Sequence, residues 1–287
     1  MRRYLNRLQT VEERCKRMQE AIGRIESRQL SGLLPGEIKA AEFRVFSQWG
    51  EDGILQHLLR HIPVSRKMFV EFGVENYDEA NTRFLLINDN WTGLVIDGSD
   101  QNIEYLKSDE IYWRYNLKAE QAFITKDNIN ELIRRNGICD EIGVLSIDID
   151  GNDYWVWEAI DVVLPSVVIV EYNSRFGAER AVTIPYRADF VRSRAHYSNI
   201  YCGASLAALC LLGRRKGYSF VGCNSAGNNA FFVLQELRPH ALPELTAREG
   251  FVRAKFRESR NADGKLSFLT EAEENTLLDK LPLVEIS

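Results

Sequence analysis

The sequence predicts an α/β fold with a mostly parallel sheet, preceded by a long N-terminal helix. From Phe46 onward, short apolar runs alternate with amphipathic helical patterns. The runs are continuous in Val, Ile and Leu, which is typical of strands covered by helices on both faces. The first 28 residues instead follow a heptad pattern. With 287 residues and a mass of 33.0 kDa, the chain is long enough for one large domain with appended segments.

The N-terminal residues carry apolar side chains three and four positions apart. These are Met1, Tyr4, Leu8, Val11, Cys15, Met18, Ile22 and Ile25. Such a seam predicts that residues 1–30 form a coiled-coil helix and that the chain is a homo-oligomer. The alternative is an amphipathic helix that lies on its own domain. Gly32, Pro35 and Gly36 end the helix and predict a linker over residues 31–45.

Residues 46–235 contain the alternating elements of the main domain. The predicted strands are KMFVEFG, TGLVIDGSD, QAFIT, GVLSIDIDG and SVVIVEYN. The predicted helices are EDGILQHLLRHI, which precedes the first strand, and ANTRFLLIND, NINELIRRNG and DYWVWEAI, which lie between strands. After an irregular stretch, ASLAALCLLGRRKG predicts a helix, and YSFVGCNSAGNNAFFVL predicts two antiparallel strands around a turn. Residues 236–287 are left as a C-terminal extension.

Composition limits the partners and the setting. The net charge of -5 and the pI near 5.6 disfavour a nucleic-acid partner. No apolar run reaches the length of a membrane span, and the N-terminus lacks the apolar region of a secretory signal. Five cysteines, odd in number and without C-x-x-C spacing, imply neither a disulfide framework nor a zinc site. We therefore expect a cytoplasmic protein.

Polar residues end the predicted strands and should meet at one edge of the sheet, where ligands bind in parallel α/β folds. The first strand ends in Glu71, Phe72 and Gly73, and the second ends in Asp97. A glycine there lets the backbone approach a ligand, and an acid there can accept the hydroxyls of a ribose. The single glycine disfavours a dinucleotide pyrophosphate, so S-adenosylmethionine, which has no phosphate, is the expected cofactor.

The later strand ends carry an acidic motif. LSIDIDGNDYWVWEAI followed by VVIVEYN resembles the FkbM-type S-adenosylmethionine methyltransferases, whose motif Asp-x-Glu-Gly-x-Glu precedes a helix and whose next strand ends in Glu. Asp148, Asp150, Gly151 and Asp153 fill that motif, with Asp twice in place of Glu, and Glu171 fills the next strand end. The resemblance covers residues 46–234.

This resemblance implies a Rossmann-like class I methyltransferase fold and an O-methyltransferase that acts on a sugar or glycan hydroxyl. FSQWGEDGIL looks like the segment that packs over the cofactor in this family. The residues expected around the cofactor are therefore Gln48, Glu51, Asp52, Glu71, Gly73, Asp97 and Ser99.

The acids after the fourth and fifth strands suggest two chemistries. The chain is also similar to metal-dependent O-methyltransferases, and on that likeness Asp150, Glu171 and Asn173 would bind Mg²⁺ or Mn²⁺ through oxygen. Without a metal ion, Asp148, Asp150 and Glu171 would supply a base and the residue that orients it. His196, in the irregular stretch, is a further candidate base.

Two other functions remain open at this stage. A nicotinamide-dependent sugar oxidoreductase would share the sheet, but it should show a fuller glycine fingerprint and a Tyr-x-x-x-Lys pair near the strand ends. A non-catalytic interaction module would use the coiled coil and keep a degenerate pocket. The sequence favours a methyltransferase that acts on a small molecule or glycan.

Overall fold

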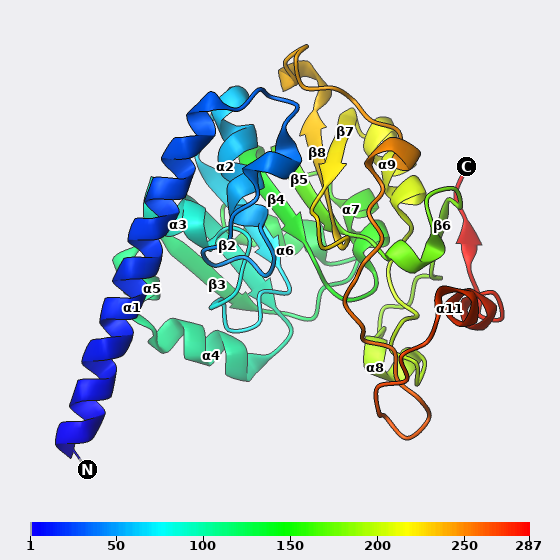
Figure 1. Ribbon diagram of the computed structural model, residues 1–287, viewed down its shortest axis with the longest axis horizontal. Helices are drawn as coiled ribbons and strands as arrows, with labels where there is room; N and C mark the ends of the chain where they lie inside the picture. Colours follow the sequence, from blue (N-terminus) through cyan, green and yellow to red (C-terminus); the bar gives the residue numbers. More distant parts are fainter. Residues whose placement is uncertain (1) are drawn as a thin grey trace.

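A seven-stranded sheet forms the centre of the molecule (Figure 1). The computed structural model describes residues 2–287. The strand order is β3-β2-β1-β4-β5-β8-β7. The strands are β1 (Met68–Phe72), β2 (Thr92–Asp97), β3 (Leu117–Gln121), β4 (Asp140–Ile147), β5 (Val163–Glu171), β7 (Tyr218–Cys223) and β8 (Asn229–Leu234).

The first five strands of this sheet are parallel, and β8 is antiparallel to both β5 and β7. The predicted terminal hairpin is therefore confirmed. The last strand of the sheet in sequence, β8, lies antiparallel between β5 and β7. A parallel sheet with this reversed strand has the Rossmann-like arrangement of class I methyltransferases, which confirms the predicted fold class.

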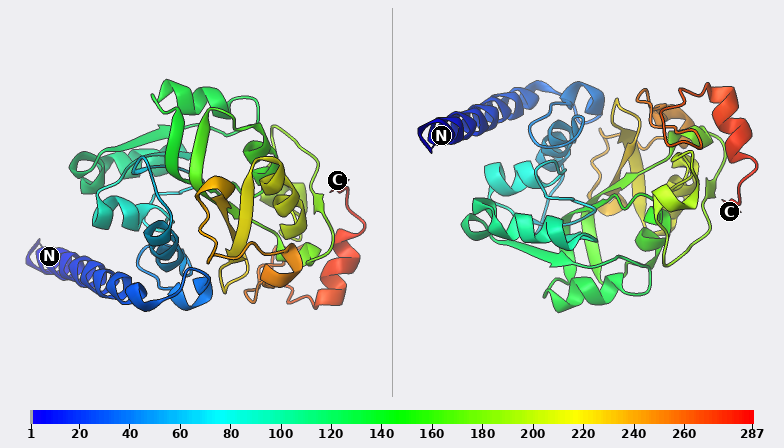
Figure 2. Two further views of the ribbon diagram at one scale, coloured as in Figure 1. Left: turned by 90° about the horizontal axis from the view of Figure 1, so that it is seen from above. Right: turned by 90° about the horizontal axis from the view of Figure 1, so that it is seen from below.

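Helices cover both faces of the sheet (Figures 1 and 2). One face packs against α2 (Glu51–His61), α3 (Arg83–Asp89), α4 (Asp100–Ser108) and α5 (Glu110–Arg114). The other packs against α6 (Ile129–Arg135), α7 (Asp153–Ala159) and α9 (Leu206–Arg215). Side chains alternate between these two cores because neighbouring strand residues point to opposite faces, as Phe69 and Val70 do in β1.

The third strand lies earlier than predicted. The apolar run QAFIT predicts a strand near residues 121–125, but β3 spans Leu117–Gln121. This strand is at the sheet edge, so only Leu117 and Ala119 are buried while Lys118 is exposed. The apolar residues Phe123 and Ile124 follow the strand and line the cavity described below.

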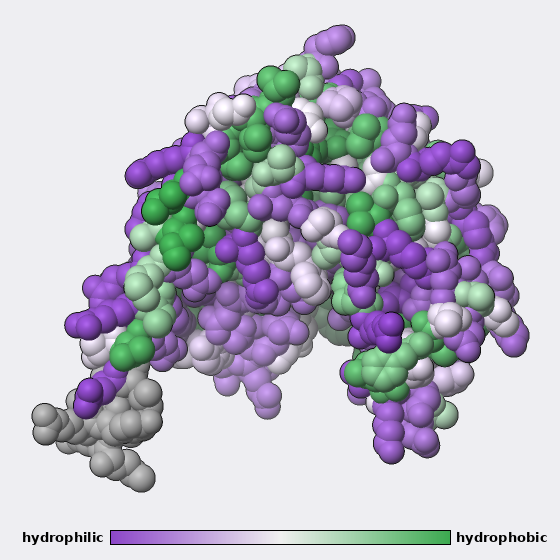
Figure 3. All heavy atoms as spheres, viewed as in Figure 1, coloured by the Kyte–Doolittle hydropathy of each residue, from purple (hydrophilic) through white to green (hydrophobic). Residues whose placement is uncertain are grey.

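The predicted N-terminal helix is present as α1 (Arg2–Gln29). Its C-terminal half packs on the domain, and Gly23 lies so close to Val45 and Phe84 that a Cβ atom would clash with both. Val11, Met18, Ile22 and Ile25 are more than half exposed. Figure 3 shows apolar surface along this helix. The side chains of Met1, Tyr4 and Leu8 lie outside the described residues. The described part of the heptad seam therefore faces away from the domain.

The segments expected to flank the domain are packed on it. Residues 31–45 contain η1 (Leu30–Gly32, in part) and η2 (Ile38–Ala41), and Ile38, Ala41 and Val45 are buried. The C-terminal extension contains η4 (Gln235–Leu237, in part), α10 (Ala247–Gly250), α11 (Glu271–Leu278) and β9 (Val284–Glu285). Strand β9 pairs with β6 (Val182–Thr183) in a second small sheet. Across residues 2–287, no helix has the length and apolar character needed to cross a membrane.

Candidate active site

A cavity of 490 Å³ lies where the parallel strands end, within the size range of small-molecule sites. The end of β1 contributes Glu71 and Gly73, and the end of β2 contributes Asp97. The end of β4 contributes Asp148 and Asp150, and the end of β5 contributes Glu171. Gln48, Phe123, Asn152, Phe190, Arg192, Asn228, Asn229, Phe256 and Glu258 also line it. The predicted convergence of the strand-end acids is therefore observed.

Gly73 allows the end of β1 to approach the turn after β4 in the cavity wall. Its φ is +69°, and a Cβ atom built on it would lie 1.7 Å from the backbone oxygen of Asp148. The glycine was expected to admit a ligand. In the structure, it first admits the neighbouring strand end, because no side chain fits between β1 and the turn after β4.

The acids of the first two strands accept hydrogen bonds from the segments that follow β1 and β2. Glu71 accepts hydrogen bonds from the amides of Asn81 (2.8 Å) and Thr82 (3.0 Å) and from the Thr82 hydroxyl (2.5 Å). Burial raises the pKa of Glu71 to about 7, and these hydrogen bonds oppose that shift. Asp97 accepts from the amides of Glu75 and Ser99, each at 2.8 Å, and from the Asn102 side chain.

The acids of the fourth and fifth strands face one another instead. Asp148, Asp150 and Glu171 each offer an oxygen, and these oxygens all lie within 4.8 Å of one another. Among the groups that the structure describes, neither the Asp148 nor the Glu171 carboxylate accepts a hydrogen bond. Burial raises the pKa of both residues well above the usual range for carboxyls, and repulsion within the cluster adds to it.

Two backbone amides of the turn after β4 donate hydrogen bonds to Asp153. The Asp153 carboxylate accepts from the amides of Ile149 (2.8 Å) and Gly151 (2.9 Å) and is fully buried at the start of α7. Asp150 lies between them with a φ of +57°, and its side chain is 62% exposed. Asp153 therefore fixes the turn, while Asp148 and Asp150 stay available to the cavity.

Arg192 is the main residue that the sequence analysis missed. It begins the short helix α8 (Arg192–Ala195), inside the stretch described only as irregular. Its Nη1 donates to Asp150 Oδ1 at 2.7 Å, its Nη2 pairs with Glu258 at 2.5 Å, and its Nε donates to the backbone oxygen of Asn199 at 2.9 Å. No local motif predicts this arginine, because its partners Asp150 and Glu258 are 42 and 66 positions away in the sequence.

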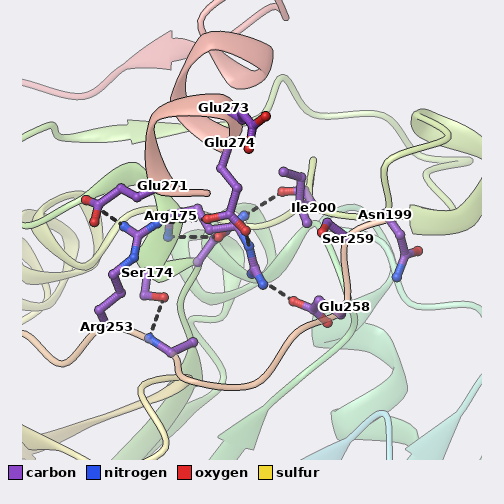
Figure 4. A network of polar contacts seen from close by, with 12 residues as sticks. Ser174, Arg175, Asn199, Ile200, Arg253, Glu258, Ser259, Glu271, Glu273 and Glu274 are labelled. Carbon is purple, nitrogen blue, oxygen red and sulfur yellow. Dashed lines mark hydrogen bonds and ion pairs between the residues drawn. The ribbon is translucent and has the colours of Figure 1, made fainter. Parts of the chain in front are cut away.

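The C-terminal extension forms one wall of the cavity. The Phe256 ring stacks on Trp49 with centroids 5.5 Å apart and planes 15° apart. Glu258 also pairs with Arg175 at 2.8 Å, and Arg175 donates to Glu274 of α11 at 3.0 Å (Figure 4). Arg253 joins Glu274 from the other side. This network lies between η3 (Ser174–Phe176) and the extension, and it fixes the extension beside the cavity.

Several predicted cofactor residues lie outside the cavity wall, which includes Gln48 but not Glu51, Asp52 or Ser99. Glu51 accepts from two backbone amides and from the Asn224 and Asn229 side chains. Asp52 Oδ2 accepts from the amides of residues 45, 46 and 47 and from the Ser47 hydroxyl. Ser99 caps α4 through Asn102. The hydrogen bonds of these three side chains therefore stabilise the fold.

Two further predicted residues are displaced from the acidic cluster. Asn173 was expected as a metal ligand, but its amide nitrogen donates to the backbone oxygens of Ile200 and Cys202, and its oxygen accepts from the Arg175 amide. Asp148 takes its place in the cluster. His196 does not line the cavity, and its Nδ1 lies 2.7 Å from the Ser198 hydroxyl. The structure does not bring this histidine to the acids.

Comparison with known proteins gives distant structural likenesses. No family model and no curated protein matches the chain. Similar solved structures include the N-terminal domain of EvdMO1 with SAH bound (10% identity, TM-score 0.43, covering 74% of this chain and 94% of that one). Another is the O-methyltransferase from Bacillus cereus in complex with SAH (14% identity, TM-score 0.36, covering 58% and 72%). A third is the CurJ carbon methyltransferase (9% identity, TM-score 0.43, covering 69% and 57%). These identities and TM-scores are low, so the function proposed below rests on the geometry of this chain.

Proposed function

We propose that the chain is an S-adenosylmethionine-dependent methyltransferase that methylates a hydroxyl group. The observation that carries this proposal is that one cavity joins the ends of β1 and β2, which suit a nucleoside, to the carboxylate cluster at the ends of β4 and β5. The resemblance of the acidic motif to FkbM-type enzymes supports the same assignment.

The cofactor half is formed by Asp97, Gly73 and Gln48. A carboxylate has about four acceptor positions, and Asp97 uses three, so Oδ2 keeps one for a ribose hydroxyl. Phe123 is half exposed beside Asp97 and offers a ring face to a base. When bound, S-adenosylmethionine supplies the electrophilic methyl group.

The acceptor half is formed by the carboxylate cluster. Methyl transfer is an in-line displacement, so the protein mainly aligns the acceptor hydroxyl and receives its proton. Asp148 and Glu171 suit that task because their carboxylates have no amide donors and their pKa is raised by burial. Their ionised form accepts the hydroxyl proton as the new oxygen–carbon bond forms.

The acceptor is proposed to be a sugar or another small polyol. Carboxylates and amides that can bind hydroxyls, such as Asn228, line this half together with the aromatic side chains of Phe190, Trp49 and Phe256. Polar groups that fix hydroxyls, beside aromatic faces that cover the carbon skeleton, are what a carbohydrate requires.

Calorimetry of the whole chain with S-adenosylhomocysteine tests the cofactor assignment. We expect saturable binding of S-adenosylhomocysteine and none of NADH, because the turn after β1 has only one glycine for a pyrophosphate. Binding of NADH alone would favour the oxidoreductase alternative. Binding of neither would favour the non-catalytic module.

We also propose that α1 pairs with a second copy of this chain. Val11, Met18, Ile22 and Ile25 keep coiled-coil spacing and are more than half exposed, while Gly23 and Ser27 use another side of α1 to contact the domain. Sedimentation of the chain should give a dimer or larger assembly, and Ile22→Glu with Met18→Glu should give a monomer. A monomeric unsubstituted chain at micromolar concentration would contradict this pairing.

A further inference from the structure

The charge around Asp150 determines whether this site uses a metal ion. We infer that Arg192 is the built-in cation of the site, holding Asp150 in place and balancing the carboxylate cluster instead of a resident divalent ion. This inference rests on the proposed function, because it concerns the same acceptor half. Arg192 is a positioning residue, since it acts through Asp150.

Arg192 is held from three sides. Its side chain is 14% exposed, and each of its nitrogens has a partner: Asp150, Glu258 and the Asn199 backbone. These partners come from the turn after β4, the C-terminal extension and the segment after α8. An arginine held in this way has lost rotamer freedom and is a fixed charge.

The expected metal ligands do not fit a resident ion. The Asn173 side chain already forms hydrogen bonds with the backbone around it. The Oδ1 atom of Asp150 accepts a hydrogen bond from Arg192 at 2.7 Å. An ion that used Asp150 would therefore sit close to a guanidinium, with no solvent layer between them. Asp148 and Glu171 alone leave a divalent ion only two undisturbed carboxylates.

Arg192 is also unlike an arginine that captures an anionic acceptor. Two carboxylates already pair with it, and its positive charge acts on Glu171 and Asp148 as well. The surroundings of this arginine are net negative, so an acceptor phosphate or carboxylate would be repelled. The remaining role for the charge is to stabilise the acids.

Manganese binding gives the direct test. Mn²⁺ is added to chelator-treated protein, as the whole chain saturated with S-adenosylhomocysteine, and is measured by electron paramagnetic resonance. We expect no stoichiometric Mn²⁺ binding to the unsubstituted chain. Arg192→Met should bind Mn²⁺ at least about a hundredfold more tightly, because three carboxylates then lose their countercharge. Arg192→Lys keeps the charge and should bind Mn²⁺ as weakly as the unsubstituted chain.

Arg187→Met is the matched control. Arg187 lies in the same segment, but its side chain is 60% exposed and, within the described part of the chain, forms an ion pair with Asp189 alone. This variant should leave Mn²⁺ binding unchanged. Since Arg192→Met loses three contacts, circular dichroism establishes its folding, and Arg192→Ala with Glu258→Gln is the second variant if it fails to fold.

Stoichiometric Mn²⁺ binding to the unsubstituted chain that Glu171→Gln abolishes would overturn the inference, as would equal Mn²⁺ affinity with and without Arg192. These readouts are separate from the proposed function. A chain that binds no S-adenosylhomocysteine would contradict the methyltransferase assignment, and the same manganese titration without that ligand would still decide the role of Arg192.

Discussion

The two halves of the cavity use the same residue types in different ways. At the ends of β1 and β2, Glu71 and Asp97 each accept three hydrogen bonds, mostly from backbone amides. At the ends of β4 and β5, Asp148 and Glu171 accept none from the described groups and face each other. A strand-end acid that has amide donors shapes its loop, whereas one without them stays available for chemistry.

The difference has a local cause in the turn after β4. This turn also has amide groups that point inward, but those of Ile149 and Gly151 go to Asp153. Because these two amides donate to Asp153, they are not available to Asp148 or Asp150. Asp97 instead accepts from the amide of Glu75, in the loop after β1, and from the amide of Ser99, directly after β2.

The largest expected effect comes from Gly73→Ala, where the two halves touch. The added Cβ would meet the Asp148 backbone oxygen at 1.7 Å, and the φ of +69° is strained for alanine. We expect a loss of more than about 4 kcal/mol of unfolding free energy, measured by urea denaturation, or no folded protein. Gly217→Ala, which has φ +83° and open space around it, should cost only about 1 kcal/mol. Equal losses in the two variants would show that the close approach is unimportant.

Glu71→Ala tests the acids that shape loops. It removes the acceptor for the Asn81 amide and for the buried amide and hydroxyl of Thr82, so the unfolding free energy should fall by about 3 kcal/mol at pH 6. Glu104→Ala on exposed α4 is the control and should change it by less than about 0.5 kcal/mol. A Glu71→Ala chain as stable as the control would remove the distinction between the halves.

Asp97→Ala tests the cofactor half. We expect S-adenosylmethionine to bind about 2 kcal/mol more weakly by calorimetry, because a charge-assisted hydrogen bond to the ribose is lost. Asp100→Ala, in the first turn of α4 and outside the cavity wall, should bind as the unsubstituted chain does. Unchanged affinity in a folded Asp97→Ala variant would assign the ribose to another residue.

Glu171→Gln should have the smallest effect and the opposite sign. The folded chain raises the pKa of Glu171, so the folded state holds a proton that the unfolded state releases above pH 4.5. Stability contributed by this group therefore falls as the pH rises from that value. The substitution should raise the unfolding free energy by about 1 kcal/mol at pH 8 and change it little at pH 4. A lower unfolding free energy at pH 8 would mean that the ionised Glu171 carboxylate is stabilised by hydrogen bonds, as that of Glu71 is.

The sequence predicted the sheet, its terminal hairpin and the edge where the acids gather, because strand periodicity and strand ends are local patterns. It did not predict which acids accept hydrogen bonds that stabilise the fold and which remain free to face the cavity. Glu51 and Asp52 lie in a segment associated with the cofactor, yet Glu51 accepts from Asn224, which is remote in the sequence, and Asp52 accepts from the Val45 amide. Arg192 and Phe256 reach the cavity through tertiary contacts that no spacing reveals. The cytoplasmic location and the role of His196 stay predictions.

The position of Phe256 and Glu258 also has a consequence for biosynthesis. The sheet is complete in the nascent chain once β8 has emerged at Leu234, but one wall of the cavity is made by residues that the ribosome adds later. Domains fold as units during synthesis, so the core can form before its site is closed. A ribosome-bound chain that ends after β8 would be folded yet open on that side, and the cavity would close only after Phe256 and Glu258 had been added.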